Sequence, residues 1–350
     1  MATYQDIARE AGVSTATVSR VLSGVGGHVR PELAERVRQT ARRMGYRSHR
    51  AARALRRQRS DAIGLVISDV ENPFFAAIAR AVEDVAAEHR HAVLLCNTDE
   101  DLAKEDLYLD LLVGERVAGV IVAPSTEELG PLGLLVDAGI PTVTVDRQVT
   151  GGPFDSVLVD NRAGAKALVG HLVSHGHRRI GVVVGTTAAT PSRERMAGCR
   201  EAVASAPGAS LVLGEGHLRD AIGTAGTMEL AGRLALDMLA ADDPPTALFC
   251  GNGLLTQGVL LALREAGLRV PADVAVAGFD DLPLFQLVDP PLTVAAQPID
   301  QIGRMAAELL FRRISEPNGD RETVVLPPDL RWRASCGDHP IREGNDHEEH

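Results

Sequence analysis

The chain has 350 residues, enough for two or three domains, and its formal net charge is −11. Aromatic residues make up only 3% of it, as is typical of α/β proteins with small, closely packed side chains. The overall charge argues against nucleic-acid binding, but residues 1–60 hold 13 arginines, no lysine and 4 acidic residues, a net charge of +9, and the rest carries −20. A basic segment on an acidic body indicates a localised phosphate-binding surface.

The sequence carries no signal for export. Its N-terminus lacks an apolar secretory core, and no apolar run approaches the roughly 20 residues that span a bilayer. The scattered cysteines Cys96, Cys199, Cys250 and Cys336 lack metal-binding or thioredoxin-like spacing. We therefore expect a cytoplasmic protein with reduced thiols and no contact with membranes.

Residues 3–22 are predicted to form two short helices joined by a tight turn. Thr3 can cap the first helix, with Asp6 three residues later, and Gly12 suits the left-handed conformation found just past a helix end. Ser14 can cap the second helix. This pattern favours a helix-turn-helix, although an ordinary surface helical hairpin would produce it as well.

The exposed face of the second helix is predicted to be small, hydroxylated and basic. Its residues are Thr15, Ala16, Thr17, Ser19 and Arg20. Such a face suits a helix that enters the major groove of DNA, and the basic charge of the surrounding segment favours this interpretation over a surface hairpin.

A third helix is predicted to begin at Pro31 and to end at Gly45. Residues 49–60 follow, which are basic and have helical propensity but are too few to form a stable helix alone in water. We expect them to fold on DNA, with Leu55 as a wedge between base steps in the minor groove, and to be a solvated linker otherwise.

The N-terminal segment resembles the lactose-repressor/galactose-repressor (LacI/GalR) family of bacterial transcription regulators. The resemblance is carried by the run Gly-Val-Ser-Thr-x-Thr-Val-Ser-Arg-Val-Leu over 12–22 and by Ala-Ala-Arg-Ala-Leu over 51–55. It implies a DNA-binding domain over 1–48, a hinge over 49–60 and a double-stranded DNA operator as partner. The DNA-contacting residues that it implies are Thr3, Ser14, Thr15, Ala16, Thr17, Ser19, Arg20, His28, Arg50, Ala52, Leu55 and Arg56.

Residues 61–335 alternate strand and helix patterns, which is typical of doubly wound parallel sheets. The expected strands are 62–67, 92–97, 117–122, 141–147, 179–184, 210–213, 247–250 and 274–279. Since the pattern restarts at 179, the sequence predicts two doubly wound α/β lobes with a cleft between them. One large sheet is the alternative and fits less well, because the second half begins a new series.

This part also resembles the LacI/GalR family, whose body is similar to periplasmic sugar-binding proteins. The matching segments include Asn-Pro-Phe-Phe at 72–75, Val-Asp-Arg at 145–147 and Gly-Phe-Asp-Asp at 278–281. The resemblance implies three crossings between the lobes, placed near Asp160, Pro290 and Pro317. The first lobe is then expected over about 61–160 and 291–317 and the second over about 161–290 and 318–335.

A candidate effector site is formed by Asn72, Phe74, Phe75, Asp146, Arg147, Arg195, Asn252 and Asp280, which lie at or near predicted strand ends. For Arg195, Asn252 and Asp280, the resemblance to the family implies polar contacts with the effector. Arginine provides fork donors and aspartate accepts two hydroxyls, which suits a polyol or a sugar acid. Phe74 could stack on a sugar ring or fill the core of its lobe, and Arg195 and Asp280 could instead form an ion-pair network between the lobes.

We expect no metal, cofactor or catalysis. His171 and His175 have zinc-like spacing, but a third ligand is not evident and a helix end is the favoured interpretation. The tail over 336–350 is polar and predicted to be disordered. Tetramer-forming members of the family that this chain resembles carry a C-terminal coiled coil, and since the tail has no such pattern, the resemblance implies a homodimer.

The sequence therefore predicts a transcriptional regulator that acts as a repressor, binds a pseudo-palindromic operator as a dimer and responds to a sugar-like small molecule. A solute-binding protein of a transport system would explain the body but not the basic head. An enzyme on an α/β scaffold is a third class, which differs from a sensor in turning its ligand over.

Overall fold

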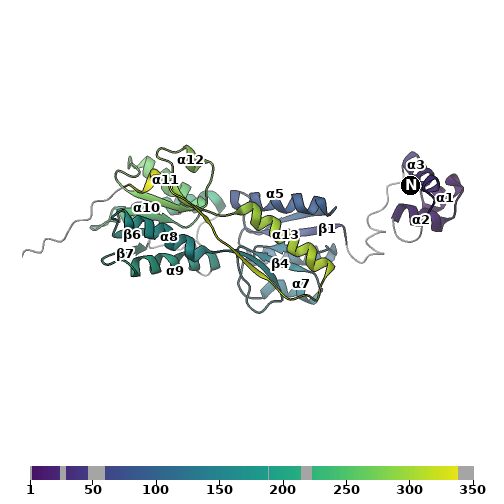
Figure 1. The fold of residues 1–350 in the computed structure, drawn as a ribbon, viewed down its shortest axis with the longest axis horizontal. Coiled ribbons are helices and arrows are strands. Elements are labelled where there is room, and N and C mark those ends of the chain that lie inside the picture. Colours follow the sequence, from purple (N-terminus) through teal and green to yellow (C-terminus); the bar gives the residue numbers. More distant parts are fainter. Residues whose placement is uncertain (1, 24–28, 46–59, 188, 214–222, 338–350) are drawn as a thin grey trace, which may run out of the picture. The chain divides into compact units, whose positions relative to one another are not determined.

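The computed structural model describes residues 2–23, 29–45, 60–187, 189–213 and 223–337. The chain divides into two compact units, residues 1–61 with 115–118 and residues 62–114 with 119–350, and Figure 1 shows the ribbon of each. The predicted hinge up to Arg59 and the predicted tail beyond Gly337 lie outside the described residues.

The N-terminal unit contains the helices α1 (Tyr4–Ala11), α2 (Thr15–Ser23) and α3 (Pro31–Arg43). All three helices contribute to one hydrophobic core, formed by Ile7, Ala8, Ala11, Val18, Val37 and Ala41. An ion pair between Arg43 and Glu10, with 2.6 Å between the charged atoms, ties α3 to α1. The predicted helix-turn-helix and third helix are therefore confirmed.

Local capping signals set the ends of these helices. The Thr3 side chain accepts a hydrogen bond from the amide of Asp6, whose carboxylate accepts one in return from the amide of Thr3, so that the two form a capping box. Gly12 closes α1 with a φ of 64°, a left-handed conformation that costs glycine little. The sharp turn between α1 and α2 follows from this one residue.

The larger unit contains two six-stranded sheets, with the orders β11-β5-β4-β3-β1-β2 and β12-β10-β9-β8-β6-β7. The first sheet consists of β1 (Ala62–Ile67), β2 (Ala92–Asn97), β3 (Val120–Val122), β4 (Thr142–Val145), β5 (Asp155–Val159) and β11 (Thr323–Leu326). The second consists of β6 (Arg179–Val183), β7 (Ser210–Leu213), β8 (Ala247–Cys250), β9 (Ala275–Phe279), β10 (Thr293–Ala296) and β12 (Asp329–Arg331). All the strand pairs are parallel except β10 with β12. We call each sheet with its helices a lobe, and the prediction of two doubly wound lobes is confirmed.

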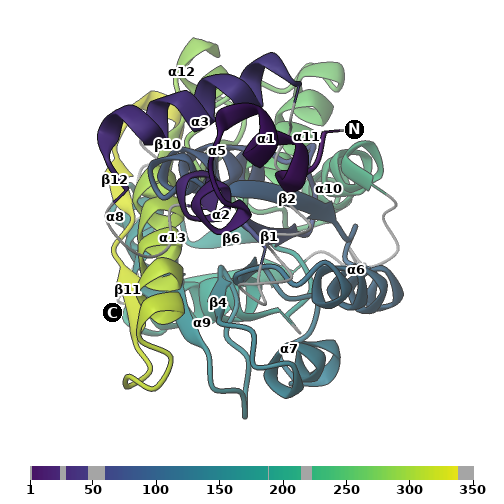
Figure 2. The ribbon, with the colours of Figure 1, turned by 90° about the vertical axis from the view of Figure 1, so that its right-hand side faces the viewer.

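Helices cover both faces of each sheet, as the right-handed crossover rule requires. In the first lobe, α5 (Pro73–Glu88) packs against α13 (Ile299–Ser315), while α6 (Leu102–Gly114) and α7 (Gly133–Asp137) lie on the other side of the sheet, as Figure 2 shows for α13 and α6. In the second lobe the packed pairs are α8 (Asn161–Ser174) with α9 (Thr190–Ala204) and α10 (Gly223–Leu239) with α11 (Gly253–Glu265).

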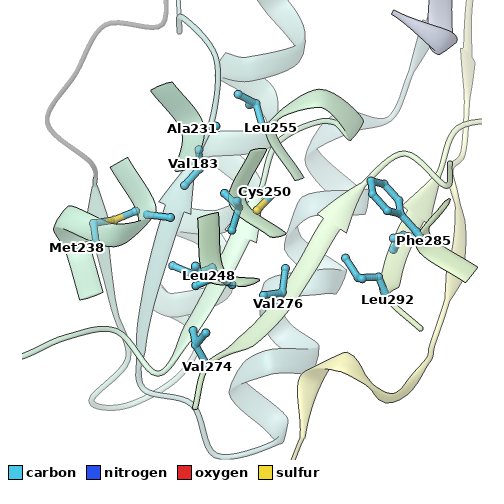
Figure 3. Close-up of a cluster of buried hydrophobic side chains, with 14 of the residues drawn as sticks. Val183, Ala231, Met238, Leu248, Cys250, Leu255, Val274, Val276, Phe285 and Leu292 are labelled. Carbon is cyan, nitrogen blue, oxygen red and sulfur yellow. The ribbon is translucent and has the colours of Figure 1, made fainter. Parts of the chain in front are cut away.

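The core of the second lobe shows how apolar strands are buried. Residues from β6, β8, β9 and β10 pack with α10, α11 and the short helix α12 (Leu284–Leu287) in one cluster (Figure 3). Phe285 of α12 and Leu248 of β8 are fully buried in it. Because such strands are covered on both faces, their sequences read as continuous apolar runs, which made them predictable.

The chain crosses between the lobes at places that differ in part from the predicted ones. The first crossing lies between β5 and α8, at Asp160, as expected. The other two lie between Ala296 and Ile299 and between Leu326 and Asp329, rather than near Pro290 and Pro317. Proline marks a chain reversal, but strand pairing decides the lobe, and β10 pairs with β9 whereas β11 pairs with β5.

The body also extends further than predicted. Cys336 was assigned to the disordered tail, but it is 1% exposed at the end of the short 3-10 helix Ala334–Cys336. Its carbonyl oxygen lies 2.8 Å from Nε2 of His177. The polar, loop-like sequence around Cys336 did not predict this contact, because His177 is 159 residues away in the chain.

Candidate functional site

The outer face of α2 is the first candidate site. Val18 is fully buried, and Val21 and Leu22 pack against the same core, whereas Thr15, Ala16 and Arg20 are exposed. Thr17 and Ser19 are half-buried. The predicted face of α2 therefore lies outside the core of its unit, and its contact with DNA stays a prediction.

Two of the predicted DNA-contacting residues hold the ends of helices. The Ser14 Oγ accepts a hydrogen bond from the Thr17 amide (3.1 Å) and lies 2.9 Å from the Thr17 Oγ1. The Thr3 Oγ1 donates to the Asp6 carboxylate over 2.7 Å, and the hydrogen bonds from Thr3 hold the pKa of Asp6 below its usual value. Both hydroxyls thus have a structural role within the unit. The other predicted residues His28, Arg50, Ala52, Leu55 and Arg56 lie outside the described residues.

The second candidate site lies at the carboxyl ends of strands in the larger unit. Asp146 and Asp280 occupy matching places in the two lobes, directly after β4 and β9. Both have a left-handed backbone, with φ of 65° and 72°. Non-glycine residues rarely adopt this conformation, and such strained residues cluster at functional sites. The same strained backbone at the same place in both lobes makes this edge a candidate site.

Asp280 is buried and fixed by hydrogen bonds. Its Oδ2 accepts one from the Gly253 amide (2.8 Å) and its Oδ1 accepts one from Nε2 of Gln297 (2.6 Å). The Oε1 of Gln297 is buried and has no hydrogen-bond partner among the described residues. Since a carboxylate oxygen can accept two hydrogen bonds, Asp280 retains acceptor capacity for a bound hydroxyl.

Asp146 links the two lobes electrostatically. Burial raises the pKa of this carboxyl to about 6, while the charges of Arg147 and Arg195 act to lower it. Glu100 and Asp280 act to raise it further. Because Asp146 belongs to the first lobe and both Arg195 and Asp280 to the second, charged groups from the two lobes lie close enough to influence one another.

Arg195 is buried beside these carboxylates. Its Nε donates to the Asn161 Oδ1 (2.8 Å), its Nη1 donates to the Gly251 carbonyl, and its guanidinium lies 3.8 Å from the centre of the Phe279 ring. Burial lowers its pKa, although Asp280 and Asp146 counter this. The hydrogen-bond partners of Arg195 are neutral groups of its own lobe, which does not favour the alternative of an ion-pair network between the lobes.

A close helix contact sets the position of Arg195. A Cβ on Gly198, one turn later in α9, would lie 2.2 Å from the carbonyl oxygen of Arg162 in α8. Only glycine permits this approach of the two helices, which brings Arg195 to Asn161 at the start of α8. The packing of small residues therefore shapes the site directly.

Asn72, Phe74, Phe75 and Asn252 lie at the starts of α5 and α11. The two asparagines cap these helices, with Asn72 accepting from the Phe74 amide (3.1 Å) and Asn252 from the Leu255 amide (2.9 Å). Phe74 and Phe75 are each 5% exposed, and their ring centres lie 5.0 Å apart in an edge-to-face arrangement. The structure thus gives both rings a packing role, and ring stacking on a ligand stays a prediction.

Several site residues were missed by the sequence analysis. Glu100, Asn161 and Gln297 contact Arg147, Arg195 and Asp280, respectively. Glu100 follows the carboxyl end of the predicted strand 92–97, so the strand-end rule would have found it. Asn161 and Gln297 follow β5 and β10, which were not among the predicted strands, so no strand-end signal pointed to them. Glu105 was missed for a different reason: it is fully buried within α6, where its Oε2 accepts from the Ser125 amide (2.7 Å), and a helical glutamate gives no signal of this.

Two further contacts bridge the lobes. The carboxylate of Glu127, in the loop after β3, accepts hydrogen bonds from Thr190 and Arg193 of α9, and its ion pair with Arg193 spans 2.9 Å. The Thr224 Oγ1 of α10 donates to the Asp69 Oδ2 over 3.0 Å. In both contacts a carboxylate from a loop that follows a strand of the first lobe accepts hydrogen bonds from a helix of the second lobe.

His171 and His175, the two histidines with zinc-like spacing, pack against each other. His171 is in the last turn of α8 and His175 caps its end, with ring centres 4.4 Å apart, and the His171 ring also stacks on Trp332 at 4.3 Å. Across the ranges that the structure describes, no group of three His, Cys, Asp or Glu side chains could hold a metal ion. This geometry is that of an aromatic cluster at a helix end.

Comparison with known proteins decides the family. Residues 3–49 match the model of bacterial regulatory proteins of the lacI family, and residues 169–336 match that of a periplasmic binding protein-like domain. The ribose operon repressor of Halalkalibacterium halodurans is 34% identical over 331 residues, which cover 94% of this chain and 96% of that protein. The chain belongs to the lacI family. The resemblance drawn from its sequence is thereby confirmed.

Solved structures of lacI family members share this fold. A LacI family transcriptional regulator from Enterococcus faecium with bound ribose matches with a TM-score of 0.71 and 28% identity, over 80% of this chain and 100% of that one. The lac repressor dimer bound to operator and the anti-inducer ONPF matches with a TM-score of 0.80 and 24% identity, over 96% of this chain and 99% of that one. Neither matching family model describes an enzyme. In the part of this lacI family member that the structure describes, no helix combines the length and apolarity needed to cross a bilayer.

Proposed function

We propose that this protein is a transcriptional repressor that binds a pseudo-palindromic DNA operator as a homodimer and responds to an uncharged sugar of about the size of ribose held between its lobes. The observation that carries the proposal is a combination within one chain of the lacI family. An exposed hydroxylated and basic helix face occurs together with strained carboxylates that two lobes place near each other.

The DNA half of the proposal rests on α2. Thr15 and Arg20 present a hydroxyl and a guanidinium on an exposed face, which are groups that hydrogen-bond base edges and phosphates. Ala16 is small and can contact a thymine methyl group. The strongly basic composition of residues 1–60 supplies the attraction to phosphates that positions such a helix.

The sugar half rests on the strand ends. Asp146 and Asp280 can accept hydrogen bonds from vicinal hydroxyls, and Arg195 can donate to a ring or hydroxyl oxygen. A related protein is named a ribose operon repressor, and a solved relative contains bound ribose. We therefore assign the site to a pentose, with Asn72, Asn252 and the ring edges of Phe74 and Phe75 as its further walls.

Exposed apolar residues support the homodimer. β2 is the edge strand of the first sheet, and Leu94 and Leu95 on it are 37% and 47% exposed. In the second lobe, Leu284 and Leu287 of α12 are 45% and 81% exposed. An apolar edge strand with unpaired backbone groups can pair with another chain, and we propose a second copy of this protein as that partner.

The test selects the operator and then adds the sugar. Full-length protein is used to enrich binding sites from a random duplex library, and the affinity for the selected duplex is measured by fluorescence anisotropy with and without D-ribose. We expect a two-fold-symmetric site and a change in affinity of about 5- to 150-fold on adding ribose, as allosteric coupling typically gives. Enrichment of no sequence would contradict the DNA half, and an unchanged affinity would contradict the sugar half.

Arg20→Ala is the matched variant for the role of α2. It should weaken binding of the selected duplex by about tenfold or more. The slope of log affinity against log salt concentration should fall by about one or less, which corresponds to the loss of at most one phosphate contact. Arg80→Ala removes an exposed arginine of α5 in the larger unit and serves as the control, with affinity expected to stay within about twofold. Equal losses in both variants would mean that net charge, rather than the α2 face, determines binding.

A further inference from the structure

Arg147, in the candidate sugar site, is held by one acidic residue. Its Nη1 donates to the Glu100 Oε2 (2.6 Å) and to the Pro124 carbonyl (3.0 Å), and its Nη2 donates to the Glu100 Oε1. Its Nε is buried without a hydrogen-bond partner among the described residues and lies 3.8 Å from the Asp146 Oδ2. Both terminal nitrogens of this guanidinium are therefore occupied by protein groups.

The turn after β2 fixes Glu100 in place. Asp99 and Glu100 both have left-handed backbones, with φ of 53° and 60°. The Asp99 carboxylate accepts hydrogen bonds from Asn97 (2.6 Å) and Lys104 (2.5 Å), which hold this unusual turn. The Glu100 side chain is 51% exposed while that of Arg147 is 10% exposed, so the carboxylate covers the guanidinium from the solvent side.

The ion pair with Glu100 leaves the Arg147 guanidinium unavailable to an anionic ligand. The charged groups that influence Asp146, counted with Asp146 itself, are three carboxylates and two guanidinium groups. Burial by itself lowers the pKa of Arg147, but the carboxylates of Glu100, Asp146 and Glu105 together raise it above its usual value, so Arg147 stays charged. A bound phosphate or carboxylate would add a further negative charge to this set.

We propose that Glu100 is a specificity-determining residue, which closes Arg147 into an ion pair so that the site between the lobes accepts uncharged sugars and rejects their phosphate esters and acids. This rests on the function proposed above, which makes the site a sugar site. Removing the Glu100 charge frees a fork donor whose geometry matches phosphate and carboxylate groups. The selectivity for charge then relaxes or reverses.

The experiment compares two ligands across matched variants of the full-length protein. Affinities for D-ribose and for D-ribose 5-phosphate are measured by isothermal titration calorimetry. Glu100→Gln keeps the size of the side chain, and it should shift the ratio of the two affinities toward the phosphate ester by about tenfold or more, as expected for removing a like charge beside a bound anion in a partly solvated site. Glu128→Gln, at an exposed glutamate of the same lobe, is the control and should leave the ratio within about twofold.

A double variant separates specificity from structure. Glu100→Gln combined with Arg147→Gln should lose the gained affinity for the phosphate ester, because the freed guanidinium is the group that binds it. If Glu100→Gln does not fold, as judged by its thermal unfolding, Glu100→Ala gives the same comparison.

The outcomes distinguish this inference from the proposed function. If wild-type protein binds ribose and Glu100→Gln leaves the ratio unchanged, the role of Glu100 is overturned while the sugar site stands. If wild-type protein prefers the phosphate ester, the role of Glu100 is overturned as well. If wild-type protein binds neither ribose nor another uncharged pentose, the sugar site itself is wrong.

Discussion

Asp146 shows how one residue joins backbone strain, burial and charge. It ends a buried strand in a left-handed conformation, and the protein accepts a carboxylate there although burial disfavours its ionised form. Ligand-binding sites tolerate the free-energy cost of a strained backbone and a buried charge when the ligand or neighbouring charges offset it. In this site the offsetting groups are Arg147 and Arg195, whose charges lower the pKa that burial raises.

The raised pKa of Asp146 predicts a specific pH dependence. Its folded-state pKa of about 6 exceeds the ordinary value of 3.8, so between about pH 4 and 6 the folded protein binds more protons than the unfolded chain, and the free energy of unfolding contributed by Asp146 falls as pH rises. Denaturant unfolding of wild type and Asp146→Asn should show a steeper fall in wild type, and the difference between the two curves is the contribution of Asp146. Asparagine tolerates the left-handed backbone, which makes it the matched substitution. Parallel pH curves for the two proteins would contradict the prediction.

Ribose binding should depend on pH in the opposite sense. A sugar hydroxyl donates to the ionised carboxylate, so affinity should increase as pH rises through about 6 and Asp146 loses its proton. Calorimetric titration of ribose at pH 5 and pH 7 measures the effect, and Asp146→Asn should bind more weakly with a smaller pH dependence.

At the scale of elements, loops that follow strands in one lobe reach a helix of the other. The loop after β3 brings Glu127 to the first turn of α9, the helix that also carries Arg195 of the site. The contact therefore connects the closure of the lobes to the position of a proposed ligand-binding side chain. A partly exposed ion pair of this kind contributes only modestly to stability, so little free energy is needed to break it.

Glu127→Gln is the test of this bridge. The variant loses the ion pair with Arg193 and should weaken ribose binding by about two- to fivefold, because a pair that is partly exposed is worth about 1 kcal/mol or less. Calorimetry on this variant and on Glu128→Gln, its exposed neighbour, gives the comparison. A ribose affinity equal to that of wild type would show that the bridge does not support the bound arrangement.

At the scale of the whole molecule, basic and acidic charges are separated along the chain. The first 60 residues carry +9 and the remainder −20, so we expect the larger unit to repel DNA and contact with an operator to be confined to the N-terminal unit. A dimer would place two such units on one operator, and the exposed edge strand β2 is the surface that we propose for association.

Leu95→Glu tests association at that edge. A charge on the edge strand should shift the protein from a dimer toward a monomer of 37.1 kDa, measured by light scattering after size-exclusion chromatography, and should weaken operator binding with it. Leu134→Glu, which places the same charge on an exposed leucine of α7, is the control and should leave the mass unchanged. Loss of association in both variants would assign the effect to general destabilisation.

The sequence by itself determined the local elements and the family. The strands 62–67 and 92–97 were predicted with their observed bounds, and Thr3, Gly12 and Ser14 end or begin helices as expected. Apolar runs, capping residues and glycine act within one element, so their signals can be read without knowing the neighbours.

Only the tertiary structure decided which elements and charges meet. It assigned β10 and β11 to the lobes opposite to those expected, paired Arg147 with Glu100 across 47 residues, and brought Asp146 near Arg195 and Asp280 of the other lobe. The physical reason is that strand pairing and ion pairing join groups far apart in the chain, and no local pattern records the identity of a distant partner. The residue types of the site were therefore predictable, whereas the pairing of Arg147 with Glu100 was not.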